Sequence, residues 1–223
     1  MRLRWIFYFF ICLSCLLSCQ RDGGEALTEK FFHILTKDQL AQVKVFEVDP
    51  LSSLLFVTAY KDDHVPVKGS LNIKEGFLDL NTNSKNALSL KMDVASWDSS
   101  LVERDERVRG VFFGIQGEDQ KFIEIFAKSR GEVTSLLHKK KTISHIGIPL
   151  SVTFNGQVQT VEAYLKAFFN DRGRLVVQST KPSSIPISGF GMSASLKALM
   201  ALCQHQTIDD KVSVEFYLEF VPI

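Results

Sequence analysis

Cysteine is scarce in this chain, and its placement excludes a disulfide framework. The 223 residues include four cysteines, of which Cys12, Cys15 and Cys19 fall within the first nineteen positions. Cys203 therefore has no second cysteine beyond that segment with which to pair. We expect Cys203 to be a small buried apolar residue on a helix, with a reactive thiol as the alternative.

The chain also lacks an excess of charge of either sign. Lysine and arginine number 26, against 25 aspartate and glutamate residues. Proteins that bind nucleic acid usually present a strongly basic surface. We therefore expect no nucleic-acid partner.

Motifs of the common enzyme classes are missing as well. The five histidines show no His-x-x-x-His spacing of the kind that binds a metal, and there is no Gly-x-Ser-x-Gly motif. Gly189-Phe190-Gly191 lacks the rest of a dinucleotide-binding fingerprint. The sequence thus predicts a protein that is not an enzyme, with no metal site and no cofactor.

What is present begins with an export signal. Arg2 and Arg4 precede an apolar run at 5–17, which is shorter than the roughly 20 residues of an ordinary membrane-spanning helix. Leu16-Leu17-Ser18-Cys19 resembles the bacterial lipobox, in which cleavage exposes a cysteine that is then acylated. We predict a lipoprotein signal peptide at 1–18 and lipidation of Cys19. A plain signal peptide and an uncleaved anchor are the alternatives.

Acylation of Cys19 would determine where the protein resides. Several acyl chains hold a protein stably at a membrane, whereas one holds it marginally. We expect a lipid-anchored protein at the periplasmic face of a bacterial membrane. Gln20 replaces the aspartate associated with inner-membrane retention, which favours the outer membrane. Residues 19–42 are then the lipidated N-terminus and a polar tether, with a short helix expected at about 27–35.

Residues 43–223 suit a single domain and are dominated by apolar residues at every second position, which is typical of strands with one dry face. The clearest alternation lies at 65–74, 88–95, 161–169 and 211–220. Less regular strands are expected at 43–48, 54–60, 76–80, 122–128, 148–154 and 175–179. Turns are expected at 155–156, 170–173 and 181–184. Many antiparallel strands of this kind form a closed barrel or a two-sheet sandwich.

Two helices are expected among the strands. Ser100 and Glu103 match the Ser-x-x-Glu capping box of a short charged helix that ends near Arg109. The segment 193–204 places Leu196, Leu199, Met200 and Cys203 at helical spacing. This second helix either packs on the barrel or uses Leu199 and Met200 to close a cavity.

The charged segment also carries a family resemblance. The run ALSLKMDVASWDSSLVERDERVRGVFFG resembles the signature of the YceI-like family of periplasmic lipid-binding proteins, with Arg104-Asp105-Glu106 and Phe112-Phe113 at the matching positions. Phe154-Asn155-Gly156 follows where the family has an apolar residue, histidine and glycine. Ser188-Gly189-Phe190-Gly191-Met192 resembles its Asp-Phe-Gly-Ile, and a long alternating strand ends the chain. Asn155 and Gly189 depart from the family pattern.

The resemblance implies an all-β fold, namely a lipocalin-like antiparallel β-barrel with one or two short helices. It also implies that the apolar interior binds an isoprenoid or similar amphipathic lipid, such as a quinone or a polyprenyl lipid, for transport or storage. The ligand-binding residues expected on this basis are Leu71, Ile73, Leu88, Leu90, Met92, Val94, Phe112, Phe113, Leu165, Phe169, Phe190, Phe216 and Leu218.

Two alternatives remain open. An alternating apolar face is also what a filled β core has, so the rival is a structural or assembly lipoprotein with a filled, ligand-free barrel. Arg104 or Arg107 either binds a polar headgroup or forms a local ion pair. The volume left between the inward side chains distinguishes a ligand cavity from a filled core.

Overall fold

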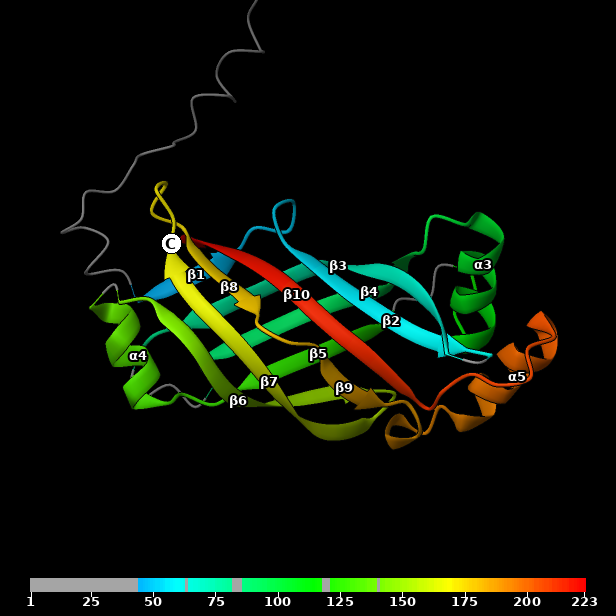
Figure 1. The fold of residues 1–223 in the computed structure, drawn as a ribbon. Coiled ribbons are helices and arrows are strands. Elements are labelled where there is room, and N and C mark those ends of the chain that lie inside the picture. The colour runs from blue at the N-terminus through cyan, green and yellow to red at the C-terminus, as the bar shows by residue number, and fades with distance from the viewer. Residues whose placement is uncertain (1–43, 63, 82–85, 118–120, 140) are drawn as a thin grey trace, which may run out of the picture. The chain divides into compact units, whose positions relative to one another are not determined.

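Ten strands carry most of the described chain, as Figure 1 shows. The computed structural model describes residues 44–223 apart from 63, 82–85, 118–120 and 140. These residues belong to a compact unit spanning Leu35–Ile223. The signal peptide, Cys19, the tether and the helix expected at 27–35 lie outside the described residues.

The strands lie where the alternating segments predict them. Their bounds are β1 Val45–Val48, β2 Leu54–Lys61, β3 Val65–Asp79, β4 Leu88–Asp98, β5 Phe122–Ala127, β6 Ile143–Phe154, β7 Gln157–Phe169, β8 Leu175–Ser179, β9 Ser183–Pro186 and β10 Lys211–Pro222. The segments expected at 65–74 and 76–80 form one long strand, β3. The turn expected at 181–184 is partly wrong, because Ser183 and Ser184 pair with Val214 and Ser213 of β10.

All the strand pairs are antiparallel, and the sheet closes on itself. The order β10-β2-β3-β4-β5-β6-β7-β8 returns to β10 through the β8–β10 pair. On each side of β10, two shorter strands follow one another along its length. On one side, β1 and β2 both pair with β10 and β3; on the other, β8 and β9 both pair with β10. The predicted antiparallel β-barrel is confirmed.

Tight turns lie at both ends of β7. Asn155 and Gly156 link β6 to β7 with φ of 50° and 72°. Positive φ at both central residues gives the turn whose twist matches the flanking strands, and Asn-Gly adopts it readily. The loop after β7 is closed by Asn170, whose backbone N–H donates to the Arg174 carbonyl at 2.9 Å. Both turns lie where the sequence predicts them.

Two irregularities between β3 and β4 change which side chains face inward. Between the pairs Ser70–Asp98 and Asn72–Asp93, β3 advances two residues while β4 advances five. An odd number of extra residues reverses the faces of a strand. Val94 and Trp97 consequently both point inward, with 0% and 6% exposure, although strict alternation would turn Trp97 outward.

Helices cover the two ends of the barrel in Figure 1. At one end, here called the helix end, lie α3 (Val102–Arg107), the π-helical turn η1 (Val108–Phe112) and α5 (Ser193–Cys203), which follows the 3-10 turn η2 (Ser188–Phe190). At the other end, here called the α4 end, lies α4 (Gly131–His138). The sequence predicts α3 and α5 but not α4. Within the described part of the chain, no helix is long and apolar enough to cross a membrane.

The predicted capping box at Ser100 is wrong. Helix α3 begins after Leu101 without a side-chain cap, and Ser100 has a φ of 62°. Ser99 instead donates to Asp105 Oδ1, from its backbone N–H at 2.9 Å and from its hydroxyl at 2.5 Å. Asp105 is 5% exposed, so this carboxylate fixes the helix to the end of β4 from within.

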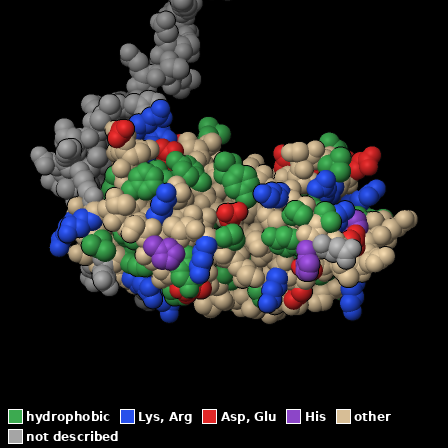
Figure 2. Space-filling view, in the orientation of Figure 1, with side chains coloured by type: hydrophobic (Ala, Val, Ile, Leu, Met, Phe, Trp, Pro, Cys, Tyr) green, Lys and Arg blue, Asp and Glu red, His purple; other side chains and the backbone are tan. Residues whose placement is uncertain are grey.

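Charges on the outside of the barrel are mixed. Figure 2 shows lysine and arginine side chains spread over one face among aspartate and glutamate. No large patch of a single charge sign is visible on that face. This distribution agrees with the near balance of 26 basic and 25 acidic residues in the sequence.

Candidate functional site

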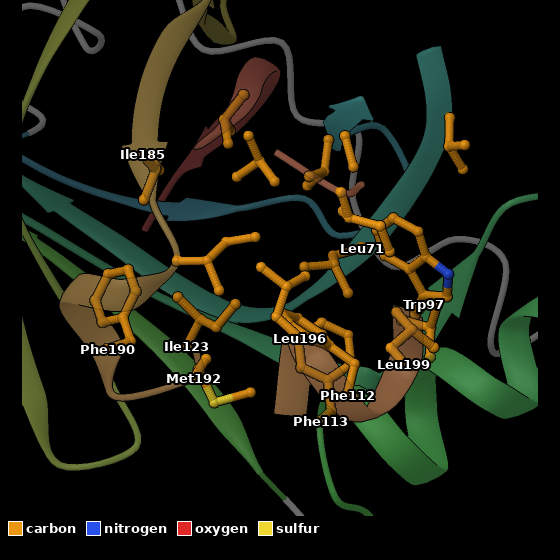
Figure 3. A pocket seen from close by; sticks show the side chains of 18 of the residues that line it. Leu71, Trp97, Phe112, Phe113, Ile123, Ile185, Phe190, Met192, Leu196 and Leu199 are labelled. Carbon is orange, nitrogen blue, oxygen red and sulfur yellow. The ribbon is translucent and has the colours of Figure 1, made fainter. Parts of the chain in front are cut away.

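The interior of the barrel contains an apolar cavity at the helix end, called the first cavity. Its volume is about 200 Å³. Strand residues such as Leu71 and Ile123 form its wall, and Leu196 and Leu199 of α5 cover it, as Figure 3 shows. Leu196 and Leu199 are each 8% exposed, so α5 turns an apolar face onto this end of the barrel.

A chain of aromatic rings runs along the first cavity. Trp97 meets Phe113 with ring centroids 6.3 Å apart, and Phe113 lies 5.9 Å from Phe154 at an angle of 88°. Phe112 contacts Phe113 at 5.0 Å, and Phe154 contacts Phe190 at 6.3 Å. Edge-to-face contacts of this kind are favourable for aromatic side chains. These rings form a continuous part of the cavity wall.

A second, smaller cavity lies at the α4 end. Its volume is about 90 Å³. Val133 and Leu137 of α4 border it together with strand residues such as Leu90 and Leu165. Leu55 and Ile125 border both cavities. The two cavities therefore adjoin at a waist formed by these two side chains, which come from β2 and β5.

Basic side chains border the otherwise apolar first cavity. Arg104 of α3, Lys61 at the end of β2 and His205 after α5 are among its lining residues. Arg104 is half-buried. In the described part of the chain its guanidinium forms neither an ion pair nor a hydrogen bond. The expected local ion pair of Arg104 is therefore not present there, and Arg107 is exposed and does not line the cavity.

His205 links α5 to the loop after β2. Its Nδ1 lies 2.8 Å from Asp62 Oδ2, and its Nε2 lies 3.3 Å from Lys61 Nζ. A lysine ammonium only donates hydrogen bonds, so Nε2 is the accepting nitrogen and Nδ1–H donates to Asp62. The backbone N–H of Thr207 lowers the pKa of Asp62, against a smaller opposing effect of burial, and Gln206 N–H and His205 lower it further.

The charged segment at 99–114 has several separate roles. Asp105 fixes Ser99, as described above, and Arg109 Nη1 donates to the Trp97 carbonyl at 2.9 Å. Val108 and Phe112 turn toward the first cavity together with Arg104. The charges therefore hold the helix against β4, while its apolar residues close the helix end.

An ion cluster stands at the α4 end. Arg174 Nη1 lies 2.7 Å from Asp49 Oδ2 and 3.4 Å from Glu219 Oε1. Asn170 Nδ2 also donates to Glu219 Oε1 at 3.1 Å. Burial raises the pKa of Asp49, but the hydrogen bonds from Ser52, Leu51 and Arg174 outweigh that effect and lower it overall. The cluster ties the ends of β1, β8 and β10 together.

The predicted ligand-binding residues fall into three groups. Leu71, Met92, Phe112, Phe113 and Phe190 line the first cavity, and Leu88, Leu90, Leu165, Phe216 and Leu218 line the second. The remaining three line neither. Ile73 and Val94 belong to the packed core with 2% and 0% exposure, and Phe169 packs on Phe46 at 6.0 Å. Contact of these residues with a ligand stays a prediction.

Several lining residues were not predicted from the sequence. Trp97 is turned inward by the irregularity in β4, and Ile185 belongs to β9, whose first two residues were expected to lie in a turn. Leu196 was recognised only as part of a helical face. Leu199 lines the first cavity as one alternative foresaw, whereas Met200 packs beside the core. Helical spacing could have indicated Leu196, but no sequence signal marks the β4 irregularity.

Cys203 lies beside the first cavity and not in a metal site of the described residues. Cys203 is a free, half-buried thiol beside the first cavity. Among the residues that the structure describes, no group of three or more histidine, cysteine, aspartate or glutamate side chains could hold a metal ion. Trp97 Nε1 is the buried side-chain nitrogen that lacks an acceptor in this part of the chain.

Comparison with solved structures identifies similar barrels. A polyisoprenoid-binding domain from Saccharophagus degradans, implicated in plant cell wall breakdown, matches with a TM-score of 0.68 and 16% identity, covering 82% of this chain and 100% of that chain. Burkholderia cenocepacia BcnA matches with a TM-score of 0.52 and 16% identity, covering 77% and 98%. No match was found among curated proteins.

The sequence itself matches a family model. The model of the YceI-like domain covers residues 46–220, which is more than half of the chain and includes every strand of the closed barrel. The resemblance of the charged segment and the phenylalanine pair is thereby confirmed. The chain belongs to the family of YceI-like domains.

Proposed function

We propose that this protein binds an isoprenoid or similar amphipathic lipid inside its barrel and holds it for transport or storage. The observation that carries the proposal is the first cavity, an apolar space of about 200 Å³ inside a closed barrel. Burial of a hydrocarbon chain there contributes about 25 cal/mol per Å² and requires no directional bonds. The likeness to a polyisoprenoid-binding domain supports the same class of ligand.

The cavity volumes define how a long chain would fit. Pockets for drug-sized ligands usually measure about 300–1,000 Å³, and the two cavities measure about 200 and 90 Å³. A long chain therefore has to occupy both, passing between Leu55 and Ile125. In this arrangement the chain enters at the helix end and its tail reaches the second cavity.

The rival function is a structural or assembly role for a filled barrel. A solid interior would leave few voids larger than a water molecule. The first cavity is larger than that and is lined almost wholly by apolar side chains. Its size and lining favour the lipid-binding function.

Native mass spectrometry tests lipid binding. The chain from residue 20 would be exported without acylation, its mass measured intact, and any bound molecule extracted and identified. We expect a stoichiometric adduct with a prenyl chain. A bare mass that stays unchanged after incubation with quinones and polyprenyl phosphates would instead support the filled barrel.

Two variants on one helix make the test specific to the first cavity. Leu196→Phe adds volume at a lining position that is 8% exposed, whereas Leu202→Phe makes the same change at an α5 position that is 51% exposed. We expect the first variant to lose most of the adduct and the second to retain it. Equal adducts in both variants would place the lipid outside the first cavity.

We also propose that acylated Cys19 anchors the protein at the periplasmic face of a bacterial membrane, most simply the outer membrane. The lipobox-like Leu16-Leu17-Ser18-Cys19 supports this proposal. Cys19→Ala should abolish incorporation of labelled fatty acid and move the protein out of the membrane fraction. Cys15→Ala, four positions earlier, is the matched control and should leave both unchanged. Labelling of the Cys19→Ala variant would refute the assignment.

A further inference from the structure

Arg104 differs from the other arginines whose contacts define the fold. Arg109 donates to the Trp97 carbonyl, Arg130 donates to the Gly147 carbonyl, and Arg174 pairs with two carboxylates. Arg104 is half-buried at the edge of the first cavity, yet within the described chain it contacts no carboxylate or carbonyl. Its guanidinium is therefore available to an occupant of the cavity.

Lys61 adds a second positive charge to the same cavity. Its Nζ contacts His205 Nε2 at 3.3 Å, and no carboxylate that the structure describes forms a direct ion pair with it. The neighbouring Asp62 is already engaged, because its Oδ1 accepts the backbone N–H groups of Gln206 and Thr207 and its Oδ2 pairs with His205. No aspartate or glutamate that the structure describes lines the first cavity.

Arg104 and Lys61 beside an apolar cavity would bind anionic and neutral lipid headgroups with different affinity. A cation at the edge of an apolar space loses hydration when a hydrocarbon chain fills that space, and this loss is costly unless an anion replaces the water. A neutral headgroup would leave the guanidinium without a charge partner. A phosphate or carboxylate would accept two parallel hydrogen bonds from it, which are stronger than bonds between neutral groups.

We propose that the ligand is an anionic amphiphile whose phosphate or carboxylate group binds Arg104, with Lys61 as a second cation, while its chain occupies the first cavity. This inference rests on the proposed function and adds the charge of the headgroup to it. It makes Arg104 a binding residue that selects among lipids with the same chain. The acidic headgroup remains at the helix end, where α3, the end of β2 and α5 meet the cavity.

The test compares headgroups on one chain. Farnesol, farnesyl phosphate and farnesoic acid share the same hydrocarbon, so differences in affinity report the headgroup. Binding can be followed by the fluorescence of Trp97, the only tryptophan after the signal segment, because Trp97 lines the first cavity. We expect farnesyl phosphate or farnesoic acid to bind about tenfold more tightly than farnesol, as a charge-assisted pair predicts. Inorganic phosphate alone should not compete.

Arg104→Gln and Arg107→Gln provide the matched comparison. Both positions lie in α3, but Arg107 is exposed and does not border the cavity. Arg104→Gln should weaken binding of the better anionic ligand about tenfold and leave farnesol unchanged. Arg107→Gln should change neither, and the two variants should unfold at similar temperatures because Arg104 has no partner to lose.

The outcomes separate this inference from the proposed function. If farnesol binds as tightly as the anionic ligands, or both arginine variants weaken the anion equally, the headgroup assignment is overturned and lipid binding stands. If inorganic phosphate binds as well as farnesyl phosphate, the site is a free-anion site and the assignment also fails. If none of the three amphiphiles binds, the proposed function fails.

Discussion

The two cavities of this barrel are lined by different kinds of side chain. The first cavity is lined by aromatic rings and by the apolar face of α5. Among the rings, Phe113 contacts both Trp97 and Phe154. The second is lined mainly by aliphatic side chains, and the Arg174 ion cluster stands at the same end. The first cavity measures about 200 Å³ and the second about 90 Å³.

The α4 end and the helix end of the barrel are also held closed by different interactions. At the α4 end, Arg174 bridges Asp49 and Glu219, so opening that end would leave charges unpaired. At the helix end, α5 is held mainly by apolar contacts and by the His205–Asp62 pair. Apolar contacts are non-directional and tolerate small shifts of a helix. We therefore expect the α4 end to contribute more to stability, and a ligand to enter at the helix end.

The largest effect on this comparison should come from Arg174→Met. The variant leaves the largely buried carboxylates of Asp49 and Glu219 without their cation, and breaking such a pair costs about 3 kcal/mol. Denaturant unfolding should reveal this loss, while affinity for lipid at the helix end stays within about twofold because the first cavity is untouched. Arg172→Met, at an exposed position of the same loop, is the control and should leave stability unchanged. A large loss of lipid affinity with little loss of stability would contradict the division of roles.

Gly69→Ala should destabilise the helix end by about 1–3 kcal/mol through overpacking. A Cβ at position 69 would lie 2.5 Å from two ring carbons of Trp97. Gly110→Ala, where nothing lies within 4 Å of the added carbon, is the matched control. Adding Trp97→Phe to Gly69→Ala should recover part of the stability, because the clashing ring carbons are removed and Nε1 has no acceptor to lose among the described residues. A double variant whose losses simply add would show that the contact with Trp97 is not the cause.

A change at the waist should alter which chain lengths bind. Ile125→Phe narrows the passage between the two cavities, so long prenyl chains should bind about tenfold more weakly while short chains keep their affinity. Calorimetric titration with prenyl phosphates of increasing length measures this. Ile73→Phe, at a buried position that borders neither cavity, controls for general overpacking. Equal weakening at every chain length would show that the two cavities do not act in series.

The smallest effect should appear in the acid dependence of stability. Asp49 and Asp62 both have lowered pKa values, so each favours the folded state above its unfolded pKa of about 3.9. That contribution is lost as the pH falls from there through the folded pKa. Asp49→Asn should flatten the acid dependence more than Asp62→Asn, because Asp49 sits in the partly buried cluster. Unfolding temperatures measured between neutral and acidic pH would test this, and identical profiles for wild type and Asp49→Asn would refute it.

The faces of the regular strands could be predicted from the sequence because nothing interrupts their alternation. In β7, Val161, Ala163, Leu165 and Ala167 are all buried as the pattern requires. In β4 the pattern holds to Val94 and then fails, since the extra residues before Asp98 turn Trp97 inward. Such an irregularity depends on pairing with β3, a distant segment, and therefore leaves no local signal.

The charged segment shows a second limit of sequence reasoning. Its sequence predicts a short charged helix, but nothing in it marks Asp105 as buried. The structure buries Asp105 and uses it to hold Ser99. A carboxylate buried against a backbone N–H and a hydroxyl looks the same in sequence as an exposed one. The same limit applies to β9, where Ser183 and Ser184 have turn-forming composition but are recruited by β10.

The position of β10 has a consequence for how the chain folds. This last strand pairs with β1, β2, β8 and β9, so the sheet cannot close and keeps two free edges until residues 211–222 have joined it. Closure joins the two extremes of the domain in one step, which is a contact of very high sequence separation and therefore slow. A nascent chain interrupted before Lys211 has an unclosed barrel and two edges exposed to aggregation.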